Sequence, residues 1–135
     1  MRRGTYALVL RVADSISIEV GALGERTFEA GTYVYLGSAH GPGGFGRIER
    51  HRAVATGERD VRHWHIDYLL PNADIERVIV WPGADRECEV AGAIPGTPIT
   101  GFGASDCSCS SHLPGLSSMA NAISWLRATG GQEWA

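Results

Sequence analysis

Aromatic, glycine-rich and basic segments follow one another within residues 31–52. An aromatic run of β-forming residues ends at Gly37, a glycine-rich loop follows, and a basic segment begins at Arg47. Glycines let a backbone approach a ligand closely, and arginines hold phosphate oxygens in a planar fork. The stretch therefore predicts contact with a phosphate-bearing ligand, which could be a nucleotide, a nucleic acid or another molecule.

Five side chains are the candidates for chemistry, and only three of them lie in this stretch. Tyr35, Arg47 and His51 belong to it, whereas Tyr6 and Glu87 must be brought to it from outside. Arg47 and His51 are four residues apart, so they share one face if the segment is a helix. A buried tyrosine in a sheet is most often a packing residue. The functional interpretation of both tyrosines therefore depends on the arginine, histidine and carboxylate around them.

The two tyrosines require strands. Residues 5–12 predict a central strand, because both of its faces are mostly apolar. Tyr6 and every second residue after it form one face, and the residues between them form the other. Residues 15–20 predict its antiparallel partner, residues 25–31 a short edge strand, and residues 32–37 the next buried strand. The first 37 residues thus predict a β-meander with both tyrosines in one sheet.

The basic segment requires a helix, which we expect from Phe45 to about Thr56, with Gly57 ending it. Residues 62–71 are ambiguous. A strand would align His63, His65 and Asp67, and a helix would pair His63 with Asp67. We favour the helix, because a break follows it before the clear strand at residues 75–81.

Residues 86–94 predict a short helix with Asp85 as its N-cap. Glu87 would then share a stripe with apolar residues and approach the core edge, whereas Glu89 would face solvent. Residues 95–115 are rich in turn-forming residues and predict an ordered loop with one short strand. Residues 117–131 predict a final amphipathic helix.

The 135 residues predict a single domain over residues 1–129, with residues 130–135 as a frayed tail. No run reaches the roughly 18 apolar residues of a membrane span, so we expect no membrane contact and a cytoplasmic location. The chain has three cysteines, an odd number that argues against a secreted disulfide framework. The elements together predict an α/β (α+β) fold with a small, mostly antiparallel central sheet flanked by helices.

Charge is unevenly distributed along the chain. The net charge is −3, whereas nucleic-acid-binding proteins usually carry a basic surface. All twelve basic residues are arginine, and residues 47–65 concentrate five of them together with three histidines. A local basic patch therefore weakens the objection to a nucleic-acid ligand without removing it.

The order of these motifs resembles the GIY-YIG endonuclease superfamily. Gly4-Thr5-Tyr6 is similar to its first motif, Tyr35-Leu36-Gly37 to its second, Arg47 with His51 to its helix, and Glu87 to its carboxylate. The runs HWHIDYLL and GFGASDCSCSSHL resemble a branch of that superfamily found in archaea and some bacteria and sometimes fused to endonuclease III. The resemblance spans most of residues 4–113.

The resemblance implies metal-dependent hydrolysis of phosphodiester bonds. Glu87, or Glu89 in its place, would hold Mg²⁺ or Mn²⁺ against a phosphate oxygen. Arg47 would neutralise charge in the transition state, and Tyr6 would activate water with help from the metal or a neighbour. Tyr35 and His51 would bind the phosphate or relay a proton.

Further residues are expected at the edge of this site. Gly37, Arg50, His63 and His65 are the expected substrate contacts, although His63 could instead be a structural partner of Asp67 at the start of a helix. DNA or RNA would be the substrate. Because the chain shows no obvious targeting domain, a protein partner or a homodimer could supply specificity.

A second constellation lies at Cys107, Cys109 and His112, which could bind zinc, with Cys88 able to complete a Cys₃His set. The spacing differs from that of common zinc motifs, so we favour a turn-rich segment packed on the core.

Three functions fit these patterns. The leading expectation is a metal-dependent endonuclease acting in DNA repair or on structured substrates. The alternatives are a nucleic-acid-binding module with this fold and little or no catalysis, and a zinc-stabilised interaction domain with core tyrosines.

Overall fold

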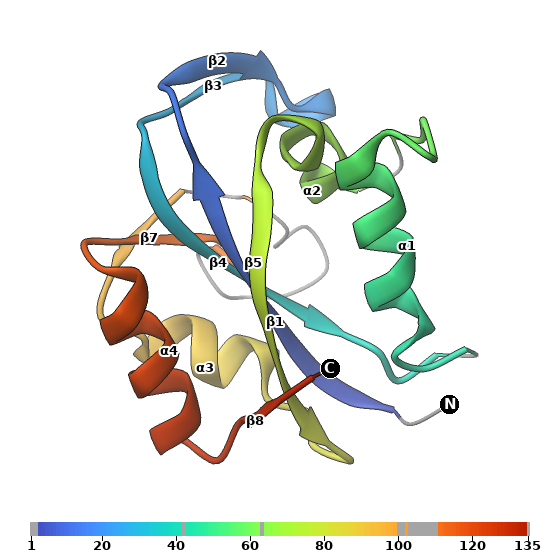
Figure 1. Ribbon diagram of the computed structural model, residues 1–135, viewed down its shortest axis with the longest axis vertical. Helices are drawn as coiled ribbons and strands as arrows, with labels where there is room; N and C mark the ends of the chain where they lie inside the picture. The colour runs from blue at the N-terminus through green and yellow to red at the C-terminus, as the bar shows by residue number, and fades with distance from the viewer. Residues whose placement is uncertain (1–2, 42, 63, 100–101, 103–110, 135) are drawn as a thin grey trace.

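A six-stranded antiparallel sheet, in the order β6-β7-β4-β1-β5-β8, forms the centre of the molecule in the computed structural model (Figure 1). The structure describes residues 3–41, 43–62, 64–99, 102 and 111–134. The fold is α+β, as expected from the sequence. The strands of the sheet are β1 (Gly4–Val12), β4 (Gly31–Ser38), β5 (Asp74–Pro82), β6 (Thr97–Pro98), β7 (Pro114–Leu116) and β8 (Gln132–Glu133).

β1 lies between β4 and β5 because both of its faces are apolar and both become buried. Its register places Tyr6 opposite Gly37 and Leu8 opposite Tyr35. The prediction that both tyrosine-bearing strands share one sheet is therefore confirmed, and the two strands are direct neighbours.

The predicted pairing of residues 5–12 with residues 15–20 is wrong. β2 (Ile16–Glu19) pairs with β3 (Glu25–Phe28) in a separate two-stranded sheet, with a 3₁₀ turn at Gly21–Leu23 between them. The side chains of β2 alternate between half-buried and exposed. β4 instead has an unbroken run of five buried residues, so it matches the two apolar faces of β1 better.

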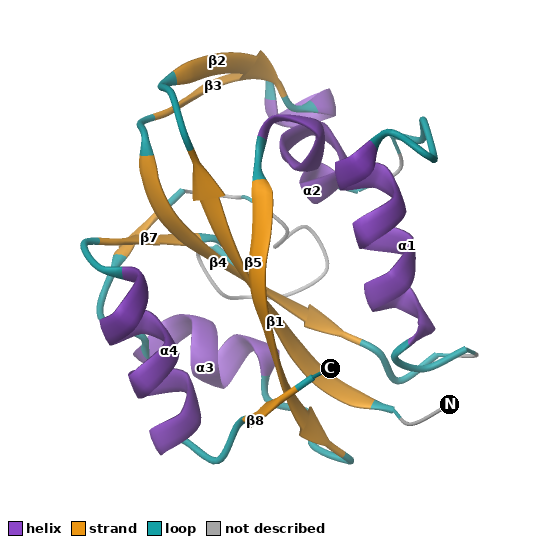
Figure 2. Cartoon of the chain, in the orientation of Figure 1, coloured by secondary structure: helices purple, strands orange, loops and turns teal. Residues whose placement is uncertain are grey.

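Two helices cover each face of the six-stranded sheet (Figure 2). α1 (Gly46–Thr56) and α2 (His65–Leu69) pack on the face that carries Tyr6 and Tyr35, and α3 (Glu87–Ala93) and α4 (Met119–Ala128) pack on the opposite face. Gly57 ends α1 in the left-handed conformation, as expected, with φ of 87°.

The helix predicted at residues 62–71 is present but shorter. It covers α2 and continues as a 3₁₀ turn over Leu70–Asn72. Asp85 was expected to cap α3 and does not, because Arg86 holds the N-cap position. The Arg86 backbone N–H donates to the Thr5 hydroxyl at 2.8 Å, which fastens the start of α3 to β1.

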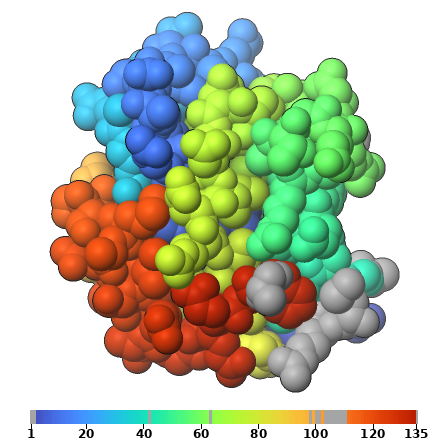
Figure 3. All heavy atoms as spheres, in the orientation of Figure 1, coloured from blue at the N-terminus to red at the C-terminus, as the bar shows by residue number. Residues whose placement is uncertain are grey.

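The chain's last described residues differ from the expected frayed tail. Residues 132–133 form β8 against β5, and the Trp134 backbone N–H donates to the Val78 carbonyl at 2.9 Å. The Trp134 ring lies 5.2 Å from the Phe45 ring, measured between centroids. Figure 3 shows these C-terminal residues lying across β5. An apolar contact and sheet pairing together hold this segment in place.

The turn-rich segment also differs in detail from its prediction, since it contributes two short strands, β6 and β7, where one was expected. Among the described residues, no helix is long and apolar enough to cross a membrane.

Candidate functional site

Tyr6, Tyr35 and His51 form a buried cluster between the sheet and α1. The Tyr6 hydroxyl lies 2.6 Å from His51 Nε2, and the Tyr35 ring centroid lies 6.0 Å from that of His51 and 6.4 Å from that of Tyr6. Alternation along β1 and β4 turns both tyrosines towards α1, and His51 lies on the buried face of that helix with Ile48 and Val54. The cluster thus joins three elements that are distant in sequence.

Burial sets the protonation of this cluster. It raises the pKa of Tyr6 well above its ordinary value, and the neighbouring Tyr35 adds to the rise while Arg47 opposes it. Burial likewise raises the pKa of Tyr35 to about 12. The pKa of His51 is lowered to about 3, first by burial and then by the charge of Arg50. All three groups are therefore neutral near pH 7, and the contact between Tyr6 and His51 joins a phenol to a neutral imidazole.

Gly37 has a steric role that the sequence did not predict. A Cβ at this position would overlap the Tyr6 ring, which lies directly opposite in the register. Gly37 therefore makes room for the Tyr6 side chain, and its backbone geometry needs no positive φ. Its contact with substrate stays a prediction.

Arg47 lies beside the cluster, as the helical spacing predicted. Its Nη1 donates to the Ser38 carbonyl at 2.8 Å, and its guanidinium carbon lies 4.6 Å from the centroid of the Trp64 ring. Its charge lowers the pKa values of Tyr6 and Tyr35 against the effect of burial. Of the two nearby arginines, Arg47 lowers the pKa values of both phenols more than Arg50 does.

Arg50 and Asp67 form a two-pronged ion pair, with Nη1–Oδ1 and Nη2–Oδ2 both at 2.9 Å. Asp67 also accepts the Trp64 backbone N–H at 3.0 Å, and the Arg50 guanidinium carbon lies 4.0 Å from the centroid of the Trp64 ring. The sequence predicted Arg50 as a substrate contact and gave Trp64 no role at the site. The guanidinium of Arg50 is instead held by a fully buried carboxylate.

Trp64 is the one large apolar side chain that is exposed among the described residues, at 37%. It contacts both Arg47 and Arg50, and its ring lies 5.9 Å from that of His51. Aromatic rings attract guanidinium groups through their faces, so Trp64 orients both arginines. The signal available in the sequence was the tryptophan within HWHIDYLL, which no periodicity distinguished from a core residue.

Glu87 lies in the first turn of α3, where its charge acts on Tyr35. Its charge adds to the rise in the pKa of Tyr35. Burial raises the pKa of Glu87 itself, a backbone hydrogen bond opposes this, and Asp85 raises it further. Glu89, the other candidate, accepts from Arg86 Nε at 2.8 Å and is mostly exposed, as its helical position predicted.

Among the predicted catalytic residues, Glu87 has the side chain that fits a divalent cation best. Its Oε2 atom is buried and lacks a hydrogen-bond partner within the described part of the chain. Such an oxygen is costly to leave unpaired, and Mg²⁺ or Mn²⁺ prefers carboxylate oxygens. The described residues contain no group of three or more histidine, cysteine or acidic side chains placed to hold a metal, so Glu87 would be a single carboxylate ligand.

The remaining predicted residues divide into two groups. His65 begins α2, and its ring lies 5.6 Å from that of Phe102, with a pKa lowered by burial. His112 lies with its Nε2 3.4 Å from the Cys88 sulfur. His63, Cys107 and Cys109 lie outside the described residues.

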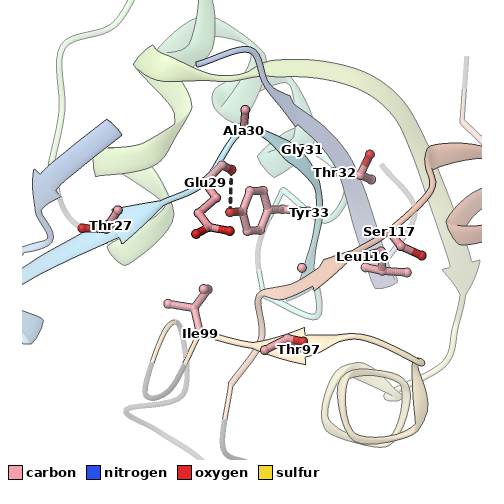
Figure 4. Close-up of a pocket in the computed structure, with 11 residues that line it drawn as sticks. Thr27, Glu29, Ala30, Gly31, Thr32, Tyr33, Thr97, Ile99, Leu116 and Ser117 are labelled. Carbon is pink, nitrogen blue, oxygen red and sulfur yellow. Dashed lines mark hydrogen bonds between the residues drawn. The ribbon is translucent and has the colours of Figure 1, made fainter. Parts of the chain in front are cut away.

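A hollow of about 520 Å³ opens where the start of β4 meets β6 and β7 (Figure 4). Tyr33 lines it and donates its hydroxyl to the Glu29 carbonyl at 2.8 Å, and Thr97 and Leu116 close the other side. None of the predicted site residues lines this hollow. The candidate site is the tyrosine cluster, whose three side chains are buried.

Comparison with known proteins adds a family. A family model described as a domain of unknown function, DUF123, matches residues 5–131, a span that includes every candidate residue. Searches of curated proteins and of solved structures find no match.

Proposed function

The chain belongs to the DUF123 family of domains of unknown function, and we propose that it is a metal-dependent endonuclease that hydrolyses phosphodiester bonds in DNA. The observation that supports this most is the meeting of Tyr6, Tyr35, His51 and Arg47 in one place, together with a buried, unpaired Glu87 oxygen on α3 whose charge acts on Tyr35. Phenols, a guanidinium and a carboxylate are the groups that phosphodiester hydrolysis needs at one place.

In this proposal Glu87 holds one Mg²⁺ or Mn²⁺ ion. When bound there, such an ion would supply Lewis-acid chemistry to the phosphate. Glu87 suits this role because its Oε2 atom is buried and has no other partner among the described residues. Burial raises the pKa of Glu87, and a bound cation would lower it. The proposal selects Glu87 over Glu89, whose carboxylate is paired with Arg86.

Arg47 binds the phosphate and stabilises the negative charge that develops on it. Its stacking on Trp64 and its bond to the Ser38 carbonyl fix the guanidinium before substrate arrives. Such preorganisation is the source of most electrostatic catalysis, because no reorientation is needed during the reaction.

Tyr6 and His51 share one proton in a buried hydrogen bond, and this bond sets how the phenol can act. Neutral His51 either accepts the Tyr6 proton at Nε2 or donates to the phenol oxygen, depending on its tautomer. In the first state the Tyr6 oxygen can accept a hydrogen bond from an attacking water, and in the second the Tyr6 hydroxyl is free to donate to the phosphate; His51 stays neutral in both, in keeping with its lowered pKa. Tyr35 packs against His51 and hydrogen-bonds the phosphate.

The substrate would meet the basic surface around α1 and α2. Trp64 is exposed there beside two arginines, and half-buried His65 begins the next helix. Arginine and aromatic side chains are the groups that contact nucleic-acid backbones and bases. We assign Arg50 to orienting this surface rather than to direct contact, because Asp67 already binds both of its terminal nitrogens.

A second candidate is a nucleic-acid-binding module with this fold and little catalysis. It is favoured by the burial of the proposed catalytic groups, since Tyr6 is 1% exposed and His51 is 0% exposed. Water would reach the Tyr6 hydroxyl only if the surrounding side chains moved. Binding of DNA without cleavage by the wild-type protein would select this candidate.

The test is cleavage of intact, nicked, branched and damaged DNA, and of structured RNA, with Mg²⁺ or Mn²⁺. Arg47→Ala and Glu87→Gln should each lower the rate at least about 100-fold, because each removes electrostatic stabilisation of the transition state. Glu89→Gln is the matched control, since it neutralises a carboxylate two residues away that faces solvent. Cleavage that survives Glu87→Gln unchanged would contradict the metal role of Glu87.

A further inference from the structure

Three side chains with planar groups lie together where α1 meets the start of α2. Trp64 is exposed, and the guanidinium carbons of Arg47 and Arg50 lie 4.6 Å and 4.0 Å from the centroid of its ring. We propose that these three residues, called the Trp64 platform, stack an unpaired base of a DNA strand while Arg47 binds the adjoining phosphate. The inference rests on the proposed nuclease function and narrows its substrate to DNA with an unpaired nucleotide at the cleavage point.

Trp64 differs from the other tryptophans of the chain in its exposure. It is 37% exposed, whereas Trp81 is buried and Trp125 and Trp134 are half-buried. Proteins bind unpaired bases on aromatic rings and guanidinium planes, because every base has a flat π-face that can lie against them. The platform therefore offers a stacking contact to a base of any identity.

The platform also carries a positive charge that the described residues leave unbalanced. Asp67 neutralises the Arg50 guanidinium. Arg47 takes part in no ion pair within the described part of the chain, and it meets the Ser38 carbonyl and the Trp64 ring instead. A phosphate would supply the missing negative charge in a geometry that a guanidinium binds well. An exposed ring beside such a cation matches the base and the phosphate of one nucleotide.

Asp67 holds the platform in place before a ligand arrives. It accepts the Trp64 backbone N–H at 3.0 Å and binds Arg50 Nη1 and Nη2, each at 2.9 Å. The Asp67 side chain is itself fully buried. Because the tryptophan backbone and one guanidinium are already fixed, binding a base immobilises few further groups and costs little conformational entropy.

The platform adjoins the proposed catalytic groups. The Trp64 ring centroid lies 5.9 Å from that of His51. Arg47 belongs to the platform, and its charge acts on the pKa values of Tyr6 and Tyr35. A nucleotide stacked on the platform would therefore bring its phosphate to the arginine that also influences both phenols.

Intact duplex is the poorer ligand for this platform. A paired base stacks on its neighbours within the helix, and it reaches a protein side chain only after it has left the stack. Leaving the stack costs least for a mismatched, damaged or single-stranded base. The platform thus selects DNA in which the base beside the scissile phosphate is already unpaired.

Binding measured without metal tests the inference apart from cleavage. Fluorescence anisotropy of the wild-type protein in a chelator compares three labelled ligands: a duplex with one bulged thymidine, the same duplex with an abasic residue at the bulge, and the uninterrupted duplex. We expect the bulged thymidine to bind about 5- to 100-fold more tightly than either of the others, the range that one stacked base gives. Equal affinity for the thymidine bulge and the abasic bulge would overturn the inference.

Substitutions locate the stacked base. Trp64→Leu should abolish the preference for the thymidine bulge over the abasic bulge, and Trp64→Phe should retain most of it because phenylalanine keeps an aromatic face. Both ligands carry the same phosphates, so a displaced Arg47 would weaken both and leave the preference unchanged. Trp125→Leu is the matched control on α4, on the opposite face of the sheet, and should keep the wild-type preference. An unchanged preference in folded Trp64→Leu protein would overturn the inference.

The inference and the nuclease proposal can fail separately. Wild-type protein that prefers the bulged thymidine but cleaves no DNA would support base binding by the platform and contradict the nuclease. Protein that cleaves DNA with Mg²⁺ but binds all three ligands equally would support the nuclease and contradict the platform.

Discussion

Asp67 holds both terminal nitrogens of Arg50 at 2.9 Å while its own side chain is completely buried. The same carboxylate accepts the Trp64 backbone N–H, so one residue of α2 fixes an arginine of α1 and the start of its own helix. Because Trp64 stacks against Arg47 as well as Arg50, this pair also orients the arginine that we assign to the phosphate.

Asp67→Asn should destabilise the protein by about 3 kcal/mol, because it leaves a largely buried guanidinium without its negative partner. The measurement is the free energy of unfolding in urea. Arg52→Ala is the control, since Arg52 is 39% exposed and lies 3.9 Å from Glu49, and its loss should change stability by less than about 0.5 kcal/mol. Equal losses of stability in the two variants would contradict the conclusion that the Arg50–Asp67 ion pair stabilises the fold.

Tyr6→Phe should cost about 1–3 kcal/mol of stability, because His51 Nε2 loses its buried partner. If the nuclease proposal is right, the same change should also lower the cleavage rate about 100-fold or more. Tyr33→Phe is a matched control, since the Tyr33 hydroxyl is also partly buried but donates to the Glu29 carbonyl rather than to a residue of the cluster. It should reduce stability and leave cleavage unchanged; a similar loss of cleavage would count against a specific role for Tyr6.

Gly37→Ala should destabilise the protein by about 1–3 kcal/mol, because the added methyl group overlaps the Tyr6 ring. Gly92→Ala is the control on α3, where a Cβ meets no atom within 4 Å. That change should be neutral or stabilising by up to about 1 kcal/mol, because alanine favours a helix. Thermal unfolding followed by circular dichroism measures both, and an unaffected Gly37→Ala protein would show that the Tyr6 ring can move freely.

Acid should weaken the fold through His51. The pKa of its imidazole is about 3 in the folded protein and about 6.5 in an unfolded chain. Between these values the unfolded chain binds a proton that the folded chain does not, so stability falls as pH drops, by at most about 1.4 kcal/mol per pH unit. The lowered pKa values of His65 and His112 act in the same direction, and the raised pKa of Glu87 acts against them.

The comparison of wild type with His51→Gln isolates this contribution. Urea unfolding between about pH 6.5 and pH 4 should show a shallower loss of stability in the variant, because only the wild type has the suppressed imidazole. Parallel slopes in the two proteins would mean that His51 takes up its proton without unfolding.

Several local features could be predicted because short-range physics decides them. The helical spacing of Arg47 and His51, the stop at Gly57 and the outward direction of Glu89 all follow from the geometry of one helix. The alternation of apolar residues likewise placed Tyr6 on the core face of β1. These properties need only the neighbours along the chain.

Other predictions failed because they concern partners far apart in sequence. The pairing of β1 with β4 rather than β2 was settled by which strand could bury two apolar faces, and β8 was held by contacts with β5 and Phe45. Local pattern carries no information on such competition between segments.

The sequence alone determined which chemical groups the protein has and which short elements carry them: two tyrosines on strands, Arg47 and His51 on one helix face, and a carboxylate on a later helix. Only the tertiary structure decided how these groups are used. It paired Arg50 with Asp67, placed Trp64 on the arginines and brought Cys88 to His112. The physical reason is that hydrogen bonds, ion pairs and metal coordination act over a few ångströms in space, and only packing of the whole core sets those distances.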